Sequence, residues 1–360
     1  MLNDIASWVA LARFPKFGAK RLGLLMRTFS TGTDVLTASQ SDLILAGIDA
    51  SLAELFLAAR DKLSPEQEAA KLERHEVTAV TILDEDYPAP LRDLFDPPAL
   101  LFYRGNFPEL SRPLIAVVGS RHPTPYGKRV TRELVDPVAR SGAVVISGMA
   151  YGIDTIAHDV TVEAGGKTVA VLGGGVDDAS LYPVANRTLS QRILASGGCL
   201  LSEFPIGTQV AKQNFPFRNR IIAALSQATL VVEAKLTSGS LITARAALEI
   251  HRDVFAVPGP IHSELSEGPN NLIKTGAQVA TCADDLLLRL GLTAQPPRTQ
   301  FISGSAEEAA LYTVLNTDAL HVDELTLKTG LDAKTVSSTL TLMEIKGSTR
   351  HLGGLYYVRG

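Results

Sequence analysis

The stretch QNFPFRNRIIAALSQATLVVEA, residues 213–234, decides the fold, because a helix passes almost directly into a buried strand. Its apolar residues first recur at three- and four-residue spacing, which is typical of a helix. They then continue as the β-branched segment ATLVVEA at 228–234, which is typical of a strand buried on both faces. We expect the helix to begin at Arg218, so that Arg218 and Arg220 lie in its first turn. Two cations are unfavourable at this positive end of the helix dipole unless an anion binds there.

The same alternation of strand and helix extends over residues 111–290. The other predicted strands are LIAVVG (114–119), AVVIS (143–147), TVAVLG (168–173), CLLSE (199–203), DVFAVPG (253–259) and AQVA (277–280). Helices are expected from about Gly127, Gly152, Ala185 and Ser240, with a short one near Pro269 and one more at the end of the segment. Repeated strand–helix units predict an α/β fold with a parallel, doubly wound, Rossmann-like sheet.

Both flanks of this segment have a different pattern. Residues 1–85 are predicted to form short helices, and the basic turn PKFGAKR at 15–21 resembles those of helix-hairpin-helix and SAM-like modules. A purely structural or protein-contacting helical domain stays open for this region. Residues 291–305 are rich in Pro, Gly, Ser and Thr, which is typical of a linker. Residues 306–360 predict three helices and a β-hairpin, the order of a winged helix. The expected domains are therefore 1–85, 86–290 and 306–360.

The composition is that of a globular protein. The 360 residues are 46% hydrophobic and 20% charged, a length that suggests two or three domains. No apolar run reaches the roughly 18 residues of a membrane span, and the N-terminus has no pattern of an export signal. Cys199 and Cys282 are far apart and have no metal-like spacing, so we expect free thiols in the cytoplasm and neither a metal site nor a cofactor.

Positive charge is concentrated in the middle of the chain. The net charge is −4, but residues 111–299 hold 18 Lys and Arg against 15 Asp and Glu, a balance of +3. Two clusters contain no acid: one between Arg13 and Arg27, the other from Phe204 to Val232, where Lys212, Arg218 and Arg220 lie. Such clusters can attract polyanions, or they can simply face solvent.

Ligands of a doubly wound sheet bind beyond the carboxyl ends of its strands. The loops there carry cations, hydroxyl groups, glycines and one aromatic ring. These residues are Gly119, Ser120 and Arg121, then Gly148, then Lys212, Phe215, Arg218 and Arg220, and finally Lys235, Gly239 and Ser240. The first loop lacks the second glycine of a dinucleotide fingerprint, which disfavours a nicotinamide or flavin cofactor. Ser240 is expected to be the N-cap of its helix.

Asp154 and His158 are spaced as a possible catalytic pair. A structural cap with a buried histidine is the alternative, because the spacing places no nucleophile near them.

The five cations Arg121, Lys212, Arg218, Arg220 and Lys235 are expected at one edge of the sheet, with Phe215 nearby. Cations beside an exposed ring suit single-stranded nucleic acid, because phosphates pair with the cations while bases stack on the ring. Phe215 can equally be buried in the core.

Several long motifs resemble the DprA (Smf) family of DNA-processing proteins over roughly residues 85–290. They are GSRHPTPYG, SGMAYGIDTIAH, VLGGGVDDASLYP, LLSEFPIGTQVAKQNFPFRNRIIAALS, VVEAKLTSGSLITARAALE and FAVPGPIHSELSEGPNNLIKTGA, in that order. The resemblance implies an extended Rossmann domain that forms homodimers, flanked by SAM-like and winged-helix modules. It also implies a protein without catalytic activity that binds and protects incoming single-stranded DNA in natural transformation and loads RecA recombinase onto it. The implied DNA-binding residues are the eleven strand-end residues named above.

Two other functions are weighed against this one. A nucleotide hydrolase of the lysine-decarboxylase-like Rossmann group is the first, but KLTSGSLIT at 235–243 lacks the adjacent acid that sugar chemistry needs. The second is a scaffold whose pocket is vestigial. In the predicted winged helix, Asp332, Lys334, Thr335, Ser337 and Ser338 offer one cation, so strong duplex binding is not expected.

Overall fold

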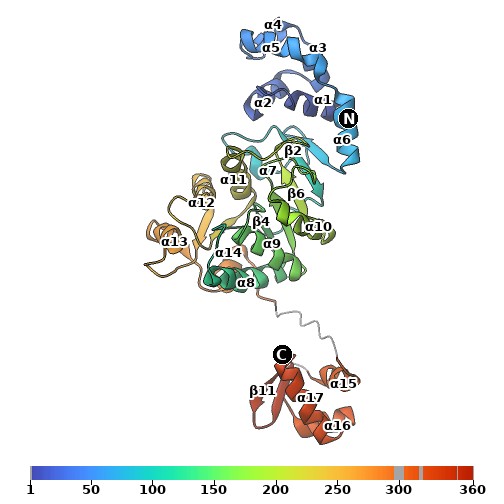
Figure 1. Cartoon of the computed structure of the whole chain (residues 1–360), viewed down its shortest axis with the longest axis vertical. Coiled ribbons are helices and arrows are strands. Elements are labelled where there is room, and N and C mark those ends of the chain that lie inside the picture. Colours follow the sequence, from blue (N-terminus) through green and yellow to red (C-terminus); the bar gives the residue numbers. More distant parts are fainter. Residues whose placement is uncertain (1, 296–303, 316–318, 347, 360) are drawn as a thin grey trace. The chain divides into compact units, whose positions relative to one another are not determined.

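The computed structural model describes residues 2–295, 304–315, 319–346 and 348–359. The chain divides into two compact units, residues 1–295 and 296–360, and each is described by itself (Figure 1). The boundary predicted near residue 85 lies inside the first unit, where the N-terminal helices and the sheet share one core.

Within its described part, the first unit contains a nine-stranded mixed sheet in the order β1-β2-β6-β5-β4-β3-β7-β8-β9. Its strands are β1 (Thr78–Thr81), β2 (Leu100–Gly105), β3 (Leu114–Val118), β4 (Val144–Ser147), β5 (Lys167–Val171), β6 (Cys199–Ser202), β7 (Ala228–Val231), β8 (Asp253–Ala256) and β9 (Gln278–Val279). The strands from β3 to β9 pair in parallel, which confirms the predicted doubly wound sheet. β3 lies in the middle; the chain winds from it through β4, β5 and β6 and then crosses to β7 on its other side.

Strands β1 and β2 extend the sheet and were not predicted. They pair with each other and with β6 in antiparallel fashion. No strand–helix–strand repeat marks them, because an antiparallel pair needs no helical crossover. The short helix α7 (Ala89–Arg92) lies between them.

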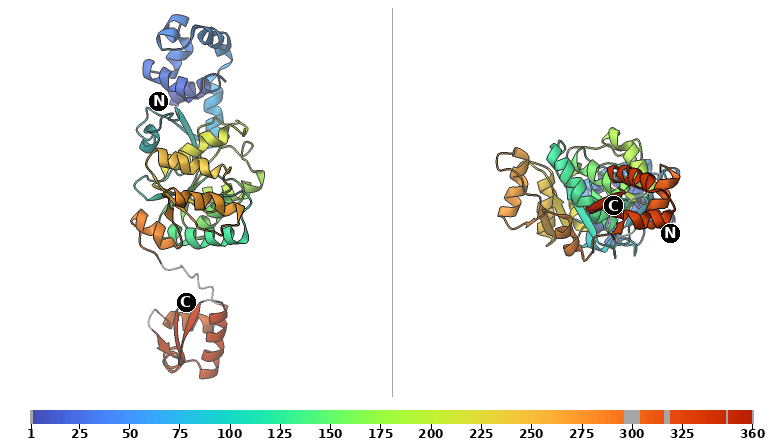
Figure 2. Two further views of the ribbon diagram at one scale, coloured as in Figure 1. Left: turned by 90° about the vertical axis from the view of Figure 1, so that its left-hand side faces the viewer. Right: turned by 90° about the horizontal axis from the view of Figure 1, so that it is seen from below.

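Helices cover both faces of the sheet (Figures 1 and 2). Alternate residues of β3 pack on opposite sides: Ala116 belongs to the core with α11 and α12, and Val117 to the core with α8, α9 and α14. This two-sided burial explains the continuous apolar runs of the strands. The helices are α8 (Pro125–Arg140), α9 (Ile153–Glu163), α10 (Arg187–Ala195), α11 (Asn214–Leu225), α12 (Ser240–Glu249), α13 (Glu264–Lys274) and α14 (Ala283–Leu290), with the 3-10 helix η2 (Val184–Asn186).

The N-terminal helices pack around aromatic side chains. The helices are α1 (Leu2–Ala12), α2 (Ala19–Thr28), α3 (Gly32–Thr37), α4 (Gln40–Leu45), α5 (Ala50–Ala59) and α6 (Pro65–Arg74), with the 3-10 helix η1 (Arg60–Lys62). The ring centroids of Phe14 and Phe17 lie 4.9 Å apart, and each contacts the ring of Phe56. Helix α1 contacts β1, so this helical region continues the core beyond the edge of the sheet.

The second unit is a winged helix, as predicted. Its helices α15 (Ala306–Val314), α16 (Val322–Thr329) and α17 (Ala333–Ile345) enclose a core that includes Leu325 and Leu340. The strands β11 (Thr349–Gly353) and β12 (Tyr356–Arg359) form the predicted hairpin, and β10 (Leu320–His321), which was not predicted, pairs with β12. Asp332 accepts the backbone N–H of Thr335 at 3.0 Å and caps α17. Over the described ranges of both units, no helix is long and apolar enough to cross a membrane.

Candidate functional site

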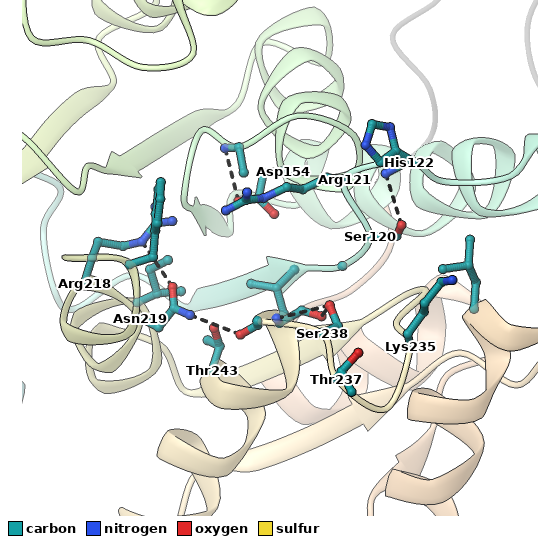
Figure 3. A pocket seen from close by; sticks show the side chains of 18 of the residues that line it. Ser120, Arg121, His122, Asp154, Arg218, Asn219, Lys235, Thr237, Ser238 and Thr243 are labelled. Carbon is teal, nitrogen blue, oxygen red and sulfur yellow. Dashed lines mark hydrogen bonds between the residues drawn. The ribbon is translucent and has the colours of Figure 1, made fainter. Parts of the chain in front are cut away.

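A cavity of about 730 Å³ opens where the winding of the sheet reverses, beyond the carboxyl ends of β3 and β7 (Figure 3). Doubly wound sheets bind ligands at this topological switch point. The walls are the turn after β3, the loop after β4, the first turns of α11 and the loop from β7 to α12. Of the predicted residues, the cavity is lined by Gly119, Ser120, Arg121, Phe215, Arg218, Lys235, Gly239 and Ser240.

The turn after β3 carries Arg121 to the opening of the cavity. A Cβ atom at Gly119 would lie 2.7 Å from Cγ1 of Ile153, so only glycine lets the turn pack this closely on α9. The hydroxyl of Ser120 accepts the backbone N–H of His122 at 3.1 Å. These contacts hold the backbone of the turn, while the Arg121 side chain stays exposed.

Glu233 fastens this turn to the end of β7. Its buried carboxylate accepts the backbone N–H of Thr124 at 2.9 Å and the Thr124 hydroxyl at 2.6 Å. Thr124 in turn caps α8 by accepting the N–H of Gly127. Neither residue was predicted, because nothing in the sequence links positions 109 residues apart.

Arg218 is buried, with 3% of its surface exposed. Its guanidinium donates to the carbonyl of Val171 and, through Nε, to Oδ1 of Asn219 at 3.1 Å. Burial lowers the pKa of Arg218 to about 10, an effect that nearby Asp154 opposes and Arg121 reinforces. Arg218 therefore stays charged at neutral pH and forms a fixed cation at one end of the cavity (Figure 3).

Asp154 and Gly148 complete the surroundings of that cation. The Asp154 carboxylate accepts the backbone N–H groups of Gly148 at 3.1 Å and Ala150 at 3.3 Å. Burial raises the pKa of Asp154, and the charge of Arg218 opposes this rise. A Cβ atom at Gly148 would lie 2.0 Å from Nη1 of Arg218, so Gly148 makes room for the guanidinium and does not itself line the cavity.

Phe215 lies half-buried in the wall of the cavity and is flanked by two cations. Cζ of Arg121 lies 5.0 Å from the ring centroid, and Cζ of Arg218 lies 6.0 Å from it. These distances are in the range of cation–π contacts. The ring thus belongs to the site and is not sealed in the core.

The loop from β7 to α12 forms the remaining wall. Lys235 is exposed and pairs with Glu264, which raises the pKa of Lys235. The hydroxyls of Ser238 and Ser240 lie 2.8 Å apart, and the carbonyl of Gly239 accepts from Asn219 at 3.2 Å. The expectation that Ser240 is the N-cap is wrong: α12 has Gly239 at that position, and Ser240 is its first residue.

Two predicted cations lie outside this cavity. Helix α11 begins at Asn214 and not at Arg218, so the expectation that both arginines occupy the first turn is wrong. Proline is tolerated early in a helix, where its missing N–H is not needed, and Pro216 therefore does not delay the start. Arg220 does not line the cavity and pairs with Glu203 at 2.7 Å. Lys212 is exposed in the turn before α11.

The Asp154–His158 spacing is structural. His158 is fully buried, and its Nδ1 lies 2.7 Å from the Thr168 hydroxyl. Burial, reinforced by the charge of Arg218, lowers the pKa of His158 to about 3, so the ring is neutral at pH 7. No cluster of three potential metal ligands occurs among the residues that the structure describes.

Comparisons with known proteins agree with the resemblance seen in the motifs. Residues 78–291 match the family model described as DNA recombination-mediator protein A, and residues 293–354 match that of the DprA winged helix domain. The chain is 37% identical over 294 residues to Protein Smf of Synechocystis sp. The aligned residues cover 80% of this chain and 73% of that protein.

Two solved structures share the fold. The X-ray structure of DNA processing protein A from Streptococcus pneumoniae has a TM-score of 0.67 and 35% identity, over 80% of this chain and 97% of that one. DNA processing protein A from Helicobacter pylori has a TM-score of 0.53 and 32% identity, over 59% of this chain and 94% of that one. The latter structure is described as giving insights into a single-stranded DNA binding mode of that protein.

Proposed function

The chain belongs to the DNA recombination-mediator protein A family, and we propose on this premise that its switch-point cavity binds single-stranded DNA. One observation carries the proposal: Arg121, Arg218 and Lys235 surround a single cavity in which the half-buried ring of Phe215 is also present. Phosphates pair with cations while unstacked bases lie on aromatic rings, so this combination suits a single strand better than a duplex.

The electrostatics of the cavity fit an anion. Three cations face two carboxylates, Asp154 and Glu264, among the lining residues. Arg218 cannot turn away, because its guanidinium is held by a backbone carbonyl and by Asn219. A cation fixed before the ligand arrives loses little conformational entropy on binding.

A DNA-binding protein, rather than an enzyme, is the function proposed. The nucleotide-hydrolase alternative needs an acid placed for sugar chemistry. Asp154 accepts two backbone N–H groups and lies beside Arg218, and Glu264 is paired with Lys235 at the rim. Both carboxylates of the cavity are therefore already engaged and are not placed for sugar chemistry. Release of free base from nucleoside monophosphates by the purified protein would overturn this choice.

Two further partners are proposed from the family resemblance. A recombination mediator transfers its single strand to a recombinase, and we propose RecA recombinase in that role.

We also propose a homodimer through the Rossmann-like domain. Its edge strand β9 exposes Val279, and Ile261 and Leu288 are also exposed in the same unit, so apolar side chains are available to a second copy. A Leu288→Glu variant that elutes at the wild-type size in light scattering would exclude Leu288 from such an interface.

The direct test is binding of a labelled oligonucleotide, single-stranded or double-stranded, at two salt concentrations. We expect tighter binding of the single strand and an affinity that falls with salt, because phosphate contacts release counterions. Equal affinity for both forms, or no dependence on salt, contradicts the proposal.

A second experiment tests the proposed recombinase partner. The protein should accelerate RecA filament assembly on single-stranded DNA, which RecA ATP hydrolysis measures.

A further inference from the structure

We propose that a second cavity, on the other side of α11, holds an unstacked base of the same single strand. This inference rests on the proposed function, because it extends the path of the strand beyond the switch-point cavity. The second cavity has a volume of about 690 Å³ and lies between the start of α2 and the start of α11. Among its lining residues are Lys20, Arg21, Glu203, Phe217 and Arg220.

Helix α11 presents the same pair of residue types to both cavities. Phe215 and Arg218, three residues apart, line the switch-point cavity; Phe217 and Arg220, also three residues apart, line the second. Residues three apart lie on one side of a helix, and a step of two residues turns about 200° around the axis. The two Phe–Arg pairs therefore occupy opposite sides of α11, and a strand that crosses the start of this helix can reach both rings.

The charges of the two cavities differ, and this difference selects the ligand of the second. Its cations Lys20, Arg21 and Arg220 face an equal number of carboxylates, those of Asp49, Asp96 and Glu203. Two of these cations are already paired: Arg220 lies 2.7 Å from Glu203, and Arg21 lies 4.0 Å from Asp49. With no excess of positive charge, the second cavity does not favour a phosphate.

A base fits this balanced lining. It is flat and uncharged, and its edge carries both hydrogen-bond donors and acceptors. Phe217 is 52% exposed and lines the cavity, so part of its ring is available for stacking. The carboxylates can accept hydrogen bonds from amino groups of a base, and exposed Gln213 can both donate and accept. Stacking on Phe217 should therefore add affinity that does not depend on salt.

The test compares two single-stranded oligodeoxynucleotides, of about four and about sixteen nucleotides, which span the usual site sizes of single-strand-binding folds. We expect Phe217→Ala to weaken binding of the long oligonucleotide about tenfold, as loss of one base stack does, and to leave binding of the short one unchanged. The slope of log affinity against log salt should not change. Phe217→Trp should keep the wild-type affinity, and Phe217→Leu should not, because leucine has no ring. Thermal unfolding should be unaffected, since the side chain is half exposed.

Each other outcome has a distinct meaning. If wild-type protein binds neither oligonucleotide, the proposed function itself is wrong. If Arg121→Ala weakens binding of both lengths while Phe217→Ala changes neither, the switch-point site stands and the second site does not exist. Recovery by leucine, a shallower salt slope, or an equal loss with the short oligonucleotide each overturns the assignment of a separate base-stacking site.

Discussion

A Cβ atom at Gly148 would lie 2.0 Å from Nη1 of Arg218, so a glycine after β4 makes the space in which a cation on α11 is held. We expect Gly148→Ala to push the guanidinium out of its contacts with Val171 and Asn219. The free energy of unfolding should fall by about 1–3 kcal/mol, as is usual for overpacking. Single-strand affinity should also fall, which titration by fluorescence anisotropy measures. Wild-type affinity in this variant would show that the position of Arg218 does not matter for binding.

Arg218→Ala should cost stability as well as affinity. The position of Arg218 near the start of α11 gives no sign of burial in the sequence, but the structure buries its side chain as a cation beside Asp154. The substitution removes the hydrogen bonds to the carbonyl of Val171 and to Oδ1 of Asn219, and each buried acceptor left without a donor costs about 1–3 kcal/mol. Urea denaturation measures the loss. If stability is unchanged, the buried environment described for Arg218 is wrong.

Arg121→Ala, in contrast, should affect binding alone. The side chain is exposed, and its main contact is with the ring of Phe215. The log–log salt slope should become shallower by about 0.7 if one phosphate contact is lost. Arg129→Ala is the matched control, because Arg129 is exposed on α8 and pairs only loosely with Glu133, at 3.7 Å. The two variants should have the same melting temperature, and equal salt slopes would remove Arg121 from the site.

Glu264→Gln should strengthen single-strand binding. The Glu264 carboxylate pairs with Lys235 at the rim of the cavity and competes there with a phosphate. Its removal frees the Lys235 ammonium and makes the cavity more positive, so affinity should rise by a few fold at low salt and less at high salt, where exposed charges are screened. Glu133→Gln on the outer face of α8 serves as the control. Unchanged or weaker binding would count against Lys235 as a phosphate contact.

His158 should make the protein sensitive to acid. Its pKa falls from 6.5 to about 3 on folding, so the unfolded chain takes up a proton first as the pH drops. The stabilising contribution is thus fully present above pH 6.5 and is lost between pH 6.5 and about 3, at up to about 1.4 kcal/mol per pH unit. His158→Asn, which can still bond Thr168, should flatten this dependence in thermal unfolding from pH 7 to 4. An equal slope in both proteins would contradict the assignment.

The sequence predicts the central strands to within a few residues, because strands such as β3 are apolar on both faces and leave a continuous signal. It does not predict β1 and β2, which join the sheet without a helical crossover. The site was predicted in part. Arg121, Arg218 and Lys235 do meet, but Arg220 does not join them, since residues two apart on a helix point about 200° away from each other. Asn219 was overlooked between two arginines, although it links α11 to the carbonyl of Gly239.

The contact between Arg121 and Phe215 has a consequence for the protein before any DNA arrives. The ring of Phe215 is half-buried in the wall of the cavity, so part of it faces water before a ligand binds. With a guanidinium 5.0 Å from its centroid, the ring presents a charged cover to the surrounding water. A bound phosphate would attract the guanidinium away from the ring. The ring would then be free to stack on a base of the same strand. The same arginine would then contact the ring in the free protein and a phosphate in the complex.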